Sequence, residues 1–119
     1  MSESPITIYH NPRCSKSRQT LQLIRDAGVG LNVVEYLKTP PTSAELASIL
    51  ERLKLEPVEL MRRKEAVFSE LNLATAELTR DELIAVMVEN PVLIERPIVV
   101  KGSDAVIGRP PENVQELLQ

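Results

Sequence analysis

Residues 6–37 read ITIYHNPRCSKSRQTLQLIRDAGVGLNVVEYL, and this stretch decides the fold. It opens with a short β-type run at residues 6–9, which the following Asn-Pro pair breaks. Apolar residues at helical spacing then predict a helix from near Cys14 to Ala27, with a glycine next in the chain as a natural end signal. Residues 31–37 suit a second strand. A strand, a helix and a strand joined by short links indicate a right-handed parallel βαβ unit.

The middle of the chain has the pattern of helices. Thr42 with Glu45, and Thr79 with Glu82, form two capping boxes, each followed by an apolar stripe. The second of these helices is expected to stop before Pro91, because a proline disfavours helical backbone in the preceding residue. Between them, a proline at position 57 suits the first turn of a shorter helix over residues 57–62.

The last third changes from helical to strand spacing. Residues 98–100 predict a strand, residues 101–104 a turn, and residues 105–107 the hairpin partner. After two prolines, residues 112–118 are expected to close the chain as a helix. The order of elements indicates a single mixed α/β domain over residues 1–119.

Composition excludes several classes of protein. With 43% hydrophobic and 26% charged residues in 119, the chain can bury a core without disulfides or bound metal. A formal net charge of −3 argues against general binding to nucleic acid or to an acidic membrane surface. No apolar run is long enough to span a bilayer, and residues 1–9 lack the pattern of a secretory signal. The single cysteine cannot form an internal disulfide, so we expect a cytoplasmic protein with a free thiol.

That cysteine, Cys14, lies in a polar stretch beside the only histidine, His10. If the helix starts at Cys14, the free N–H groups of its first turn and the helix dipole favour the thiolate. Basic side chains at positions 13, 16 and 18 add positive potential, as His10 does when protonated, and the hydroxyls of Ser15 and Ser17 can donate hydrogen bonds to the anion. A cysteine with the reference pKa of about 8.5 is only about 3% thiolate at pH 7. Surroundings that lower this pKa would therefore make Cys14 a nucleophile. The alternative is a buried structural cysteine, which would desolvate these charges.

Three other cysteine chemistries fail on spacing. A phosphatase-type loop needs an arginine where Thr20 stands, and a dithiol redox motif needs a cysteine where Ser17 stands. Zinc needs three or four ligands, and one cysteine with one histidine are too few. An oxidised or adducted Cys14 must therefore be released by an outside thiol, for which glutathione and glutaredoxin are the obvious cytosolic candidates.

Three arginines could hold an anion near such a thiolate. Arg96 and Arg109 each precede a proline next to the end of a predicted strand. Because proline restricts the backbone, each arginine is expected to extend from a rigid loop. Arg62 ends the short middle helix. A guanidinium fork matches a tetrahedral oxyanion, and without such groups the anion and the thiolate would repel each other. The alternative for each arginine is a solvated surface position.

Five segments in order resemble the glutaredoxin-dependent arsenate reductase family: IYHNPRCSKSRQTL, YLKTPPT, LMRRKE, ERPIVV and IGRPPENV. The match covers residues 6 to about 118 and is nearest to a short subgroup with Ser-Lys-Ser after the cysteine. The resemblance implies a thioredoxin-like α/β fold, with a mixed four-stranded sheet and a helical insertion at approximately residues 42–91. It also implies a reaction in which arsenate is reduced to arsenite, with glutathione as co-substrate, glutaredoxin as partner and no bound cofactor or metal.

The resemblance also assigns roles to individual residues. Cys14 is the nucleophile, His10 favours its thiolate, and Ser17 stabilises it. The oxyanion is bound by Asn11 and by the arginines, and Pro97 is the cis-proline beside the active cysteine. Among the arginines, Arg96 and Arg109 match family positions directly; at the third, Arg62 is chosen over its neighbour Arg63. The chain departs from well-studied members in having Ser15-Lys16 where they have Gly-Thr.

Two other functions stay open from the sequence. One is a thiol-transfer enzyme that removes glutathione from mixed disulfides and does not turn over arsenate. The other is a redox-responsive adaptor that binds RNA polymerase, although regulators of that kind usually carry a two-cysteine switch that this chain lacks.

Overall fold

The computed structural model describes residues 5–118. Residues 1–4, part of the stretch considered above for a secretory signal, and residue 119 lie outside the described residues. The chain divides into two compact units: one holds the residues up to Thr39 and from Arg96 onward, and the other holds Pro40–Glu95. The helical insertion expected at residues 42–91 lies within the second unit. That the whole chain is one domain stays a prediction.

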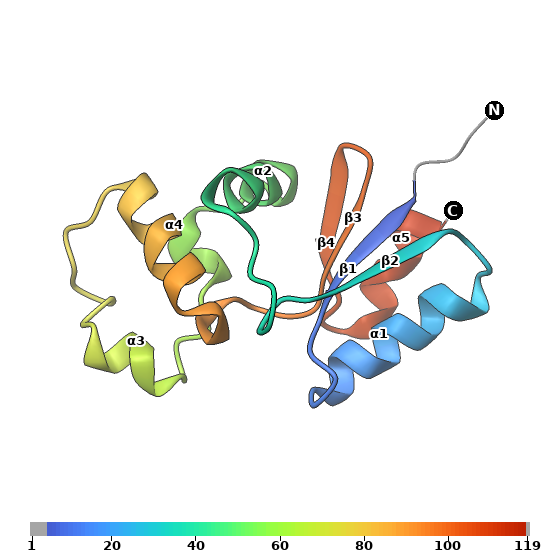
Figure 1. Ribbon diagram of the computed structural model, residues 1–119, viewed down its shortest axis with the longest axis horizontal. Coiled ribbons are helices and arrows are strands. Elements are labelled where there is room, and N and C mark those ends of the chain that lie inside the picture. The colour runs from blue at the N-terminus through green and yellow to red at the C-terminus, as the bar shows by residue number, and fades with distance from the viewer. Residues whose placement is uncertain (1–4, 119) are drawn as a thin grey trace. The chain divides into compact units, whose positions relative to one another are not determined.

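The first unit is built on a mixed four-stranded sheet in the order β2-β1-β3-β4 (Figure 1). Its strands are β1 (Ile6–His10), β2 (Leu31–Glu35), β3 (Ile98–Lys101) and β4 (Asp104–Ile107). β1 pairs parallel with β2 and antiparallel with β3, and β3 pairs antiparallel with β4. The predicted parallel pairing of β1 with β2, the hairpin and the mixed sheet of a thioredoxin-like α/β fold are confirmed.

The register brings three loops to one end of this sheet. Tyr9 in β1 pairs with Ile98 in β3, and Ile98 pairs with Ile107 in β4. The loop after β1, which carries Cys14, therefore lies at the same end as the segment before β3 and the segment after β4. Those two segments carry Arg96 and Arg109.

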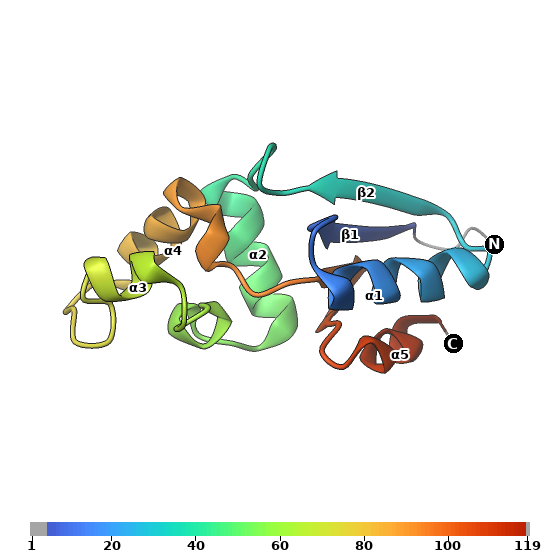
Figure 2. The same cartoon turned by 90° about the horizontal axis from the view of Figure 1, so that it is seen from below.

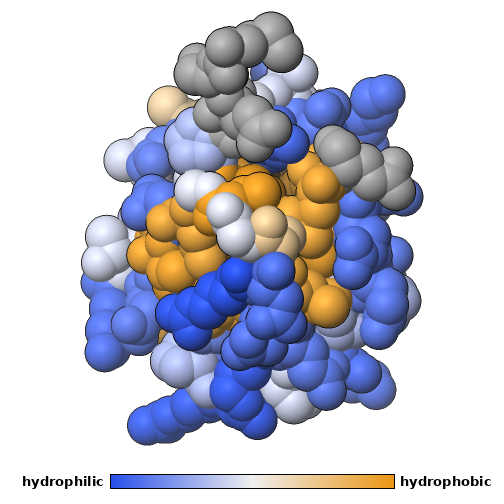
Figure 3. All heavy atoms as spheres, turned by 90° about the vertical axis from the view of Figure 1, so that its right-hand side faces the viewer, coloured by the Kyte–Doolittle hydropathy of each residue, from blue (hydrophilic) through white to orange (hydrophobic). Residues whose placement is uncertain are grey.

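One face of the sheet is covered by helices, and the core lies beneath them. α1 (Ser15–Asp26) and α5 (Gln115–Leu118) lie on the same side of β1 (Figure 2), with the 3-10 helix η3 (Pro111–Val114) packed against α1. Alternate residues of β1, which include Ile6 and Ile8, point to this side and are buried. The core cluster contains Ile6, Ile8, Leu21, Ile24, Val99, Val114 and Leu117. Partly buried leucines and valines pack around it, and apolar side chains reach the surface on the side drawn in Figure 3.

The second unit is helical. It contains α2 (Ser43–Leu53), η1 (Pro57–Leu60), α3 (Ala66–Glu70), α4 (Arg80–Glu89) and η2 (Pro91–Leu93), where η denotes a 3-10 helix. Both predicted capping boxes are present, and α4 stops before Pro91 as expected. α2 and α4 pack together, and their buried leucine, isoleucine and methionine side chains join others from η1, η2 and the segments beside them.

Two helix predictions need correction. The helix at Pro57 is a 3-10 turn that ends at Leu60, because the chain then extends: Met61 forms a β-bridge with Ile94, and the Arg62 N–H donates to the Leu93 carbonyl at 2.7 Å. The C-terminal helix begins as η3 and becomes α-helical only at α5. α3 and η2 were not predicted, because helices of five and three residues are too short to show a helical period. No helix within residues 5–118 is long and apolar enough to cross a membrane.

Gly108, the residue after β4, lies where a side chain cannot fit. A Cβ atom there would approach the Thr20 side-chain oxygen to 2.5 Å and Pro97 Cγ to 2.8 Å. We therefore expect Gly108→Ala to lower the free energy of unfolding by about 1–3 kcal/mol, the usual cost of overpacking. Urea denaturation of the variant and of the wild-type protein measures this difference in the free energy of unfolding. Gly30→Ala is the matched control, because its Cβ would meet nothing closer than 3.9 Å; equal losses in both variants would contradict the packing argument.

Candidate active site

Cys14 occupies the N-cap position of α1, at the turn that follows β1. The turn is formed by a hydrogen bond from the Cys14 N–H to the Asn11 carbonyl at 3.0 Å. The Asn11 side-chain oxygen accepts a second bond from the Arg13 N–H at 3.0 Å, and Arg18 donates to the Pro12 carbonyl at 2.9 Å. These contacts fix the loop, so the cysteine is held at the start of the helix as predicted.

His10, Asn11 and Ser17 form a small buried network behind this loop. His10 Nδ1 and the Ser17 hydroxyl oxygen are 2.6 Å apart, and that oxygen also accepts the Asn11 N–H at 3.0 Å. The hydroxyl of Ser17 was expected to donate to the thiolate. Instead it is engaged with His10 and Asn11, and Ser17 acts on the sulfur through its backbone N–H.

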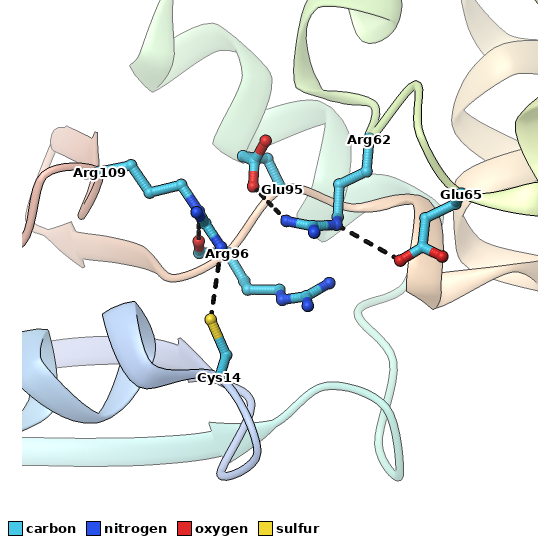
Figure 4. Close-up of polar contacts among 6 residues, drawn as sticks. All are labelled: Cys14, Arg62, Glu65, Glu95, Arg96 and Arg109. Atoms are coloured by element: carbon cyan, nitrogen blue, oxygen red, sulfur yellow. Dashed lines mark hydrogen bonds and ion pairs between the residues drawn. The ribbon is translucent and has the colours of Figure 1, made fainter.

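Arg109 contacts the cysteine directly. Its Nη2 lies 3.4 Å from Cys14 Sγ, and its Nε donates to the Arg96 carbonyl at 2.6 Å (Figure 4). The peptide bonds before Pro97 and Pro110 are both cis; the first was expected from the resemblance and the second was not. The structure thus brings Cys14 together with two of the three predicted arginines.

Two residues that the sequence analysis missed hold the Arg109 segment in place. The Asn113 amide donates to the carbonyls of Ile107 and Arg109, at 3.2 and 3.0 Å. The Thr20 hydroxyl donates to Lys16 and is 3.3 Å from the Gly108 carbonyl oxygen. No sequence pattern marks either residue, because their partners are distant in sequence or are backbone atoms.

The net effect of these surroundings lowers the pKa of Cys14. Burial, which leaves the residue only 7% exposed, raises this pKa, but the Ser17 N–H and the guanidinium groups of Arg96 and Arg109 outweigh it. The cysteine is therefore buried, as in the structural alternative, yet its neighbours favour the thiolate. The cations that lower this pKa, Arg96 and Arg109, come from the far end of the sequence, and the expected basic residues at positions 13, 16 and 18 are not among them.

The pKa of His10 is also lowered, mainly by burial. Arg25 and Arg18 lower it further, while Glu35 raises it. The ring is therefore neutral at pH 7, and the positive potential at the sulfur comes from the arginines. In this state the contact between His10 Nδ1 and the Ser17 hydroxyl joins two neutral groups.

Arg62 belongs to the second unit, where two carboxylates hold its guanidinium. Nη1 is 2.8 Å from Glu95 and Nε is 3.5 Å from Glu65 (Figure 4). The antiparallel bridge between Met61 and Ile94 brings the segments that carry Arg62 and Glu95 side by side. Arg62 is thus a partly buried, ion-paired residue, whereas Arg63 is exposed. Within residues 5–118, no three histidine, cysteine, aspartate or glutamate side chains gather as a possible metal site.

Residues 9–117 match the ArsC family, and the chain belongs to it. The chain is 53% identical to the uncharacterized Escherichia coli K12 protein YfgD, over 95% of this chain and 96% of that protein. It is 43% identical to an arsenate reductase of Neisseria meningitidis strain Z2491, over 95% and 97% of the two chains. The solved arsenate reductase of Vibrio cholerae is 47% identical, with a TM-score of 0.91 over 97% of this chain and 98% of that one.

Replacing Arg109 by Ala removes a cation that stabilises the thiolate, so the pKa of Cys14 should rise. We expect the pH midpoint of iodoacetamide alkylation to move upward in Arg109→Ala. Mass spectrometry follows the reaction without interference, because Cys14 is the only cysteine. Arg13→Ala is the control, since Arg13 is adjacent to Cys14 in sequence but is not among the groups that shift its pKa. A larger upward shift in Arg13→Ala than in Arg109→Ala would contradict this assignment.

Burial of His10 predicts a ring that titrates below its ordinary pKa of 6.5 in the folded protein. The ring resonances of the single histidine, followed by NMR from pH 4 upward, measure this midpoint. The same protein unfolded in urea should titrate near the ordinary value. A folded-state midpoint above that of the unfolded chain would show that the surroundings favour the charged ring, which would contradict this account.

Proposed function

We propose that the protein is a cytoplasmic arsenate reductase that uses Cys14 as its nucleophile and takes electrons from glutathione and glutaredoxin. The observation that carries the proposal is the contact between Cys14 Sγ and Arg109, with Arg96 beside them. Their positive charges stabilise the thiolate and can also neutralise an incoming tetrahedral oxyanion. A single cysteine without a resolving partner fits a reaction in which outside thiols supply both electrons.

The first step forms a covalent adduct. The Cys14 thiolate attacks the arsenic of arsenate, a sulfur–arsenic bond forms, and one arsenic–oxygen bond breaks. The departing oxygen leaves as water after it takes up protons. Arg96 and Arg109 balance the charge of the two anions as they approach, because forked guanidinium donors match the remaining arsenate oxygens.

The second step reduces the arsenic. A glutathione thiolate attacks the Cys14 sulfur, a disulfide bond forms, and the arsenic departs with the electron pair of the sulfur–arsenic bond. Arsenic(V) becomes arsenic(III) and is released as arsenite, while two sulfur atoms are oxidised to the mixed disulfide. A glutaredoxin thiolate then attacks the glutathione sulfur, which restores the Cys14 thiolate.

The remaining residues support this chemistry. His10 and Ser17 form the pair through which a proton can pass near the sulfur, and Asn11 orients the loop through its side chain and its N–H. Pro97 shapes the segment that presents Arg96. Arg62 is proposed as an oxyanion-binding residue from the family resemblance alone.

The names of the relatives support the same reaction. Proteins called arsenate reductase, from Neisseria meningitidis and Vibrio cholerae, are 43% and 47% identical to this chain over nearly its full length.

A second candidate is a thiol-transfer enzyme that removes glutathione from mixed disulfides. The ion pairs of Arg62 favour it, because Glu65 and Glu95 together cancel the positive charge that an oxyanion would need. Such an enzyme would use the Cys14 thiolate and glutaredoxin in the same way, without arsenate.

The proposed function predicts arsenite formation that requires both glutathione and glutaredoxin. In Cys14→Ser the rate should fall to background, because the hydroxyl is a far weaker nucleophile at neutral pH. In Arg109→Ala, kcat/KM for arsenate should fall about 10-fold or more, the value of a lost charge-assisted hydrogen bond. Arsenite is measured by chromatography coupled to elemental mass spectrometry.

Arg52→Ala is the control, because Arg52 lies on α2 and is not part of the proposed machinery. A wild-type protein that exchanges with glutathione disulfide but forms no arsenite would exclude the reductase and leave the thiol-transfer enzyme.

A further inference from the structure

A cavity of about 450 Å³ lies along α1, on the side of β2. Its walls come from the first unit alone: one wall is a face of α1 and the other is formed by β1 and β2, which lie alongside α1 in Figure 2. His10 and Pro12, close in sequence to Cys14, line the end nearest the active-site loop. The volume is in the range of cavities that bind small molecules.

The α1 wall carries positive charge. Arg18, Gln22 and Arg25 line it, and their spacing places them on one helical stripe that continues from Cys14. Arg18 is partly engaged by the Pro12 carbonyl. Arg25 is exposed, and its side chain forms no hydrogen bond or ion pair with any residue in the range 5–118, so its guanidinium is available to a carboxylate.

The strand wall supplies a negative charge and apolar surface. Glu35 pairs in register with His10, and Val33, two residues earlier on the same face of β2, is 38% exposed. The ion pair of Glu35 is with Lys38 at 3.5 Å, and the Lys38 side chain is 78% exposed. Such a surface pair is weak, so a ligand ammonium group can replace Lys38.

From this pattern we infer that the cavity binds a small peptide thiol that bears carboxylates and one ammonium group. This ligand is the glutathione of the proposed function, on which the inference rests. Its carboxylates would face Arg18 and Arg25, and its ammonium group would face Glu35. Along the helix, Arg18 and Arg25 lie about 6 and 16 Å from Cys14, at about 1.5 Å per residue. Helical side chains point back toward the N-terminus, and Arg25 lines the same cavity as His10 and Pro12, so its guanidinium lies nearer to Cys14 than its backbone does. An extended tripeptide spans about 10 Å, so a ligand seated here can still present its sulfur to Cys14.

The topology of the sheet gives a second argument. In the order β2-β1-β3-β4, the cavity lies on the β2 side of the Cys14 loop. Arg96 and Arg109 lie on the β3 and β4 side. When a thiolate attacks the Cys14 sulfur and arsenic leaves, the incoming and departing atoms lie on opposite sides of that sulfur. A thiol that arrives from the cavity therefore approaches opposite to an oxyanion held by the arginines.

The first test is a titration with S-methylglutathione, which cannot react, followed by NMR of ¹⁵N-labelled wild-type protein. Amide signals of α1 and β2 around the cavity are expected to shift in a saturable way, and Arg25→Ala is expected to weaken binding about 5-fold, the value of one exposed charge pair of about 1 kcal/mol. Saturable shifts confined to other parts of the chain, or no shifts, would overturn the inference.

The second test contains no arsenate. The Cys14 thiolate attacks glutathione disulfide, which forms the protein–glutathione mixed disulfide and releases one glutathione thiolate. The ratio of this rate to the rate with the uncharged bis(2-hydroxyethyl) disulfide is measured for each variant. The ratio should fall several-fold in Arg25→Ala and recover in Arg25→Lys, because the positive charge returns.

Arg52→Ala is the matched control, since Arg25 and Arg52 each lie in the last turn of their helix. An unchanged ratio in Arg25→Ala, or an equal fall in Arg52→Ala, would overturn the inference. Because neither test uses arsenate, failure of the wild-type protein to reduce arsenate would contradict the proposed function without changing these results.

Discussion

The site depends on the balance between burying a sulfur atom and keeping it charged. Removing Cys14 from water favours the neutral thiol, which no longer acts as a nucleophile. The structure offsets this cost with charges that are themselves held in place: Arg109 reaches the sulfur at 3.4 Å while its own Nε is bonded to the Arg96 carbonyl. Because the arginines are fixed before any substrate arrives, little reorganisation is needed when a second anion approaches.

The sheet makes this arrangement possible. Pairing of β1 with β3, and of β3 with β4, brings residues about 80 to 95 positions apart to one end of the same unit. Gly108 then allows the segment after β4 to pack against Thr20 on α1, and Asn113 holds the backbone on either side of it. The active-site loop is thus supported from α1 on one side and from the β3–β4 hairpin on the other.

Sequence patterns predicted the parts of this fold that depend on local physics. The capping boxes at Thr42 and Thr79, the βαβ unit and the hairpin are local signals, and all are present. The cysteine at the helix start was likewise predictable. The groups that stabilise its charge were predictable only in part. Proximity in sequence favoured the basic residues at positions 13, 16 and 18, but Arg18 donates to the Pro12 carbonyl, whereas strand pairing brings Arg96 and Arg109 to the sulfur. The ion pair of Arg62 with Glu95 depends on a bridge between distant residues, which no local pattern encodes.

The central claim is that the surroundings of Cys14 lower its pKa and so favour the thiolate, although the residue is buried. The most direct measurement is the ultraviolet absorbance of the thiolate as a function of pH, with Cys14→Ser as the blank that removes the signal of the two tyrosines. The account predicts a folded-state midpoint below that of the same chain unfolded in urea. A folded midpoint equal to or above the unfolded one would mean that burial outweighs the arginines, and it would contradict the account.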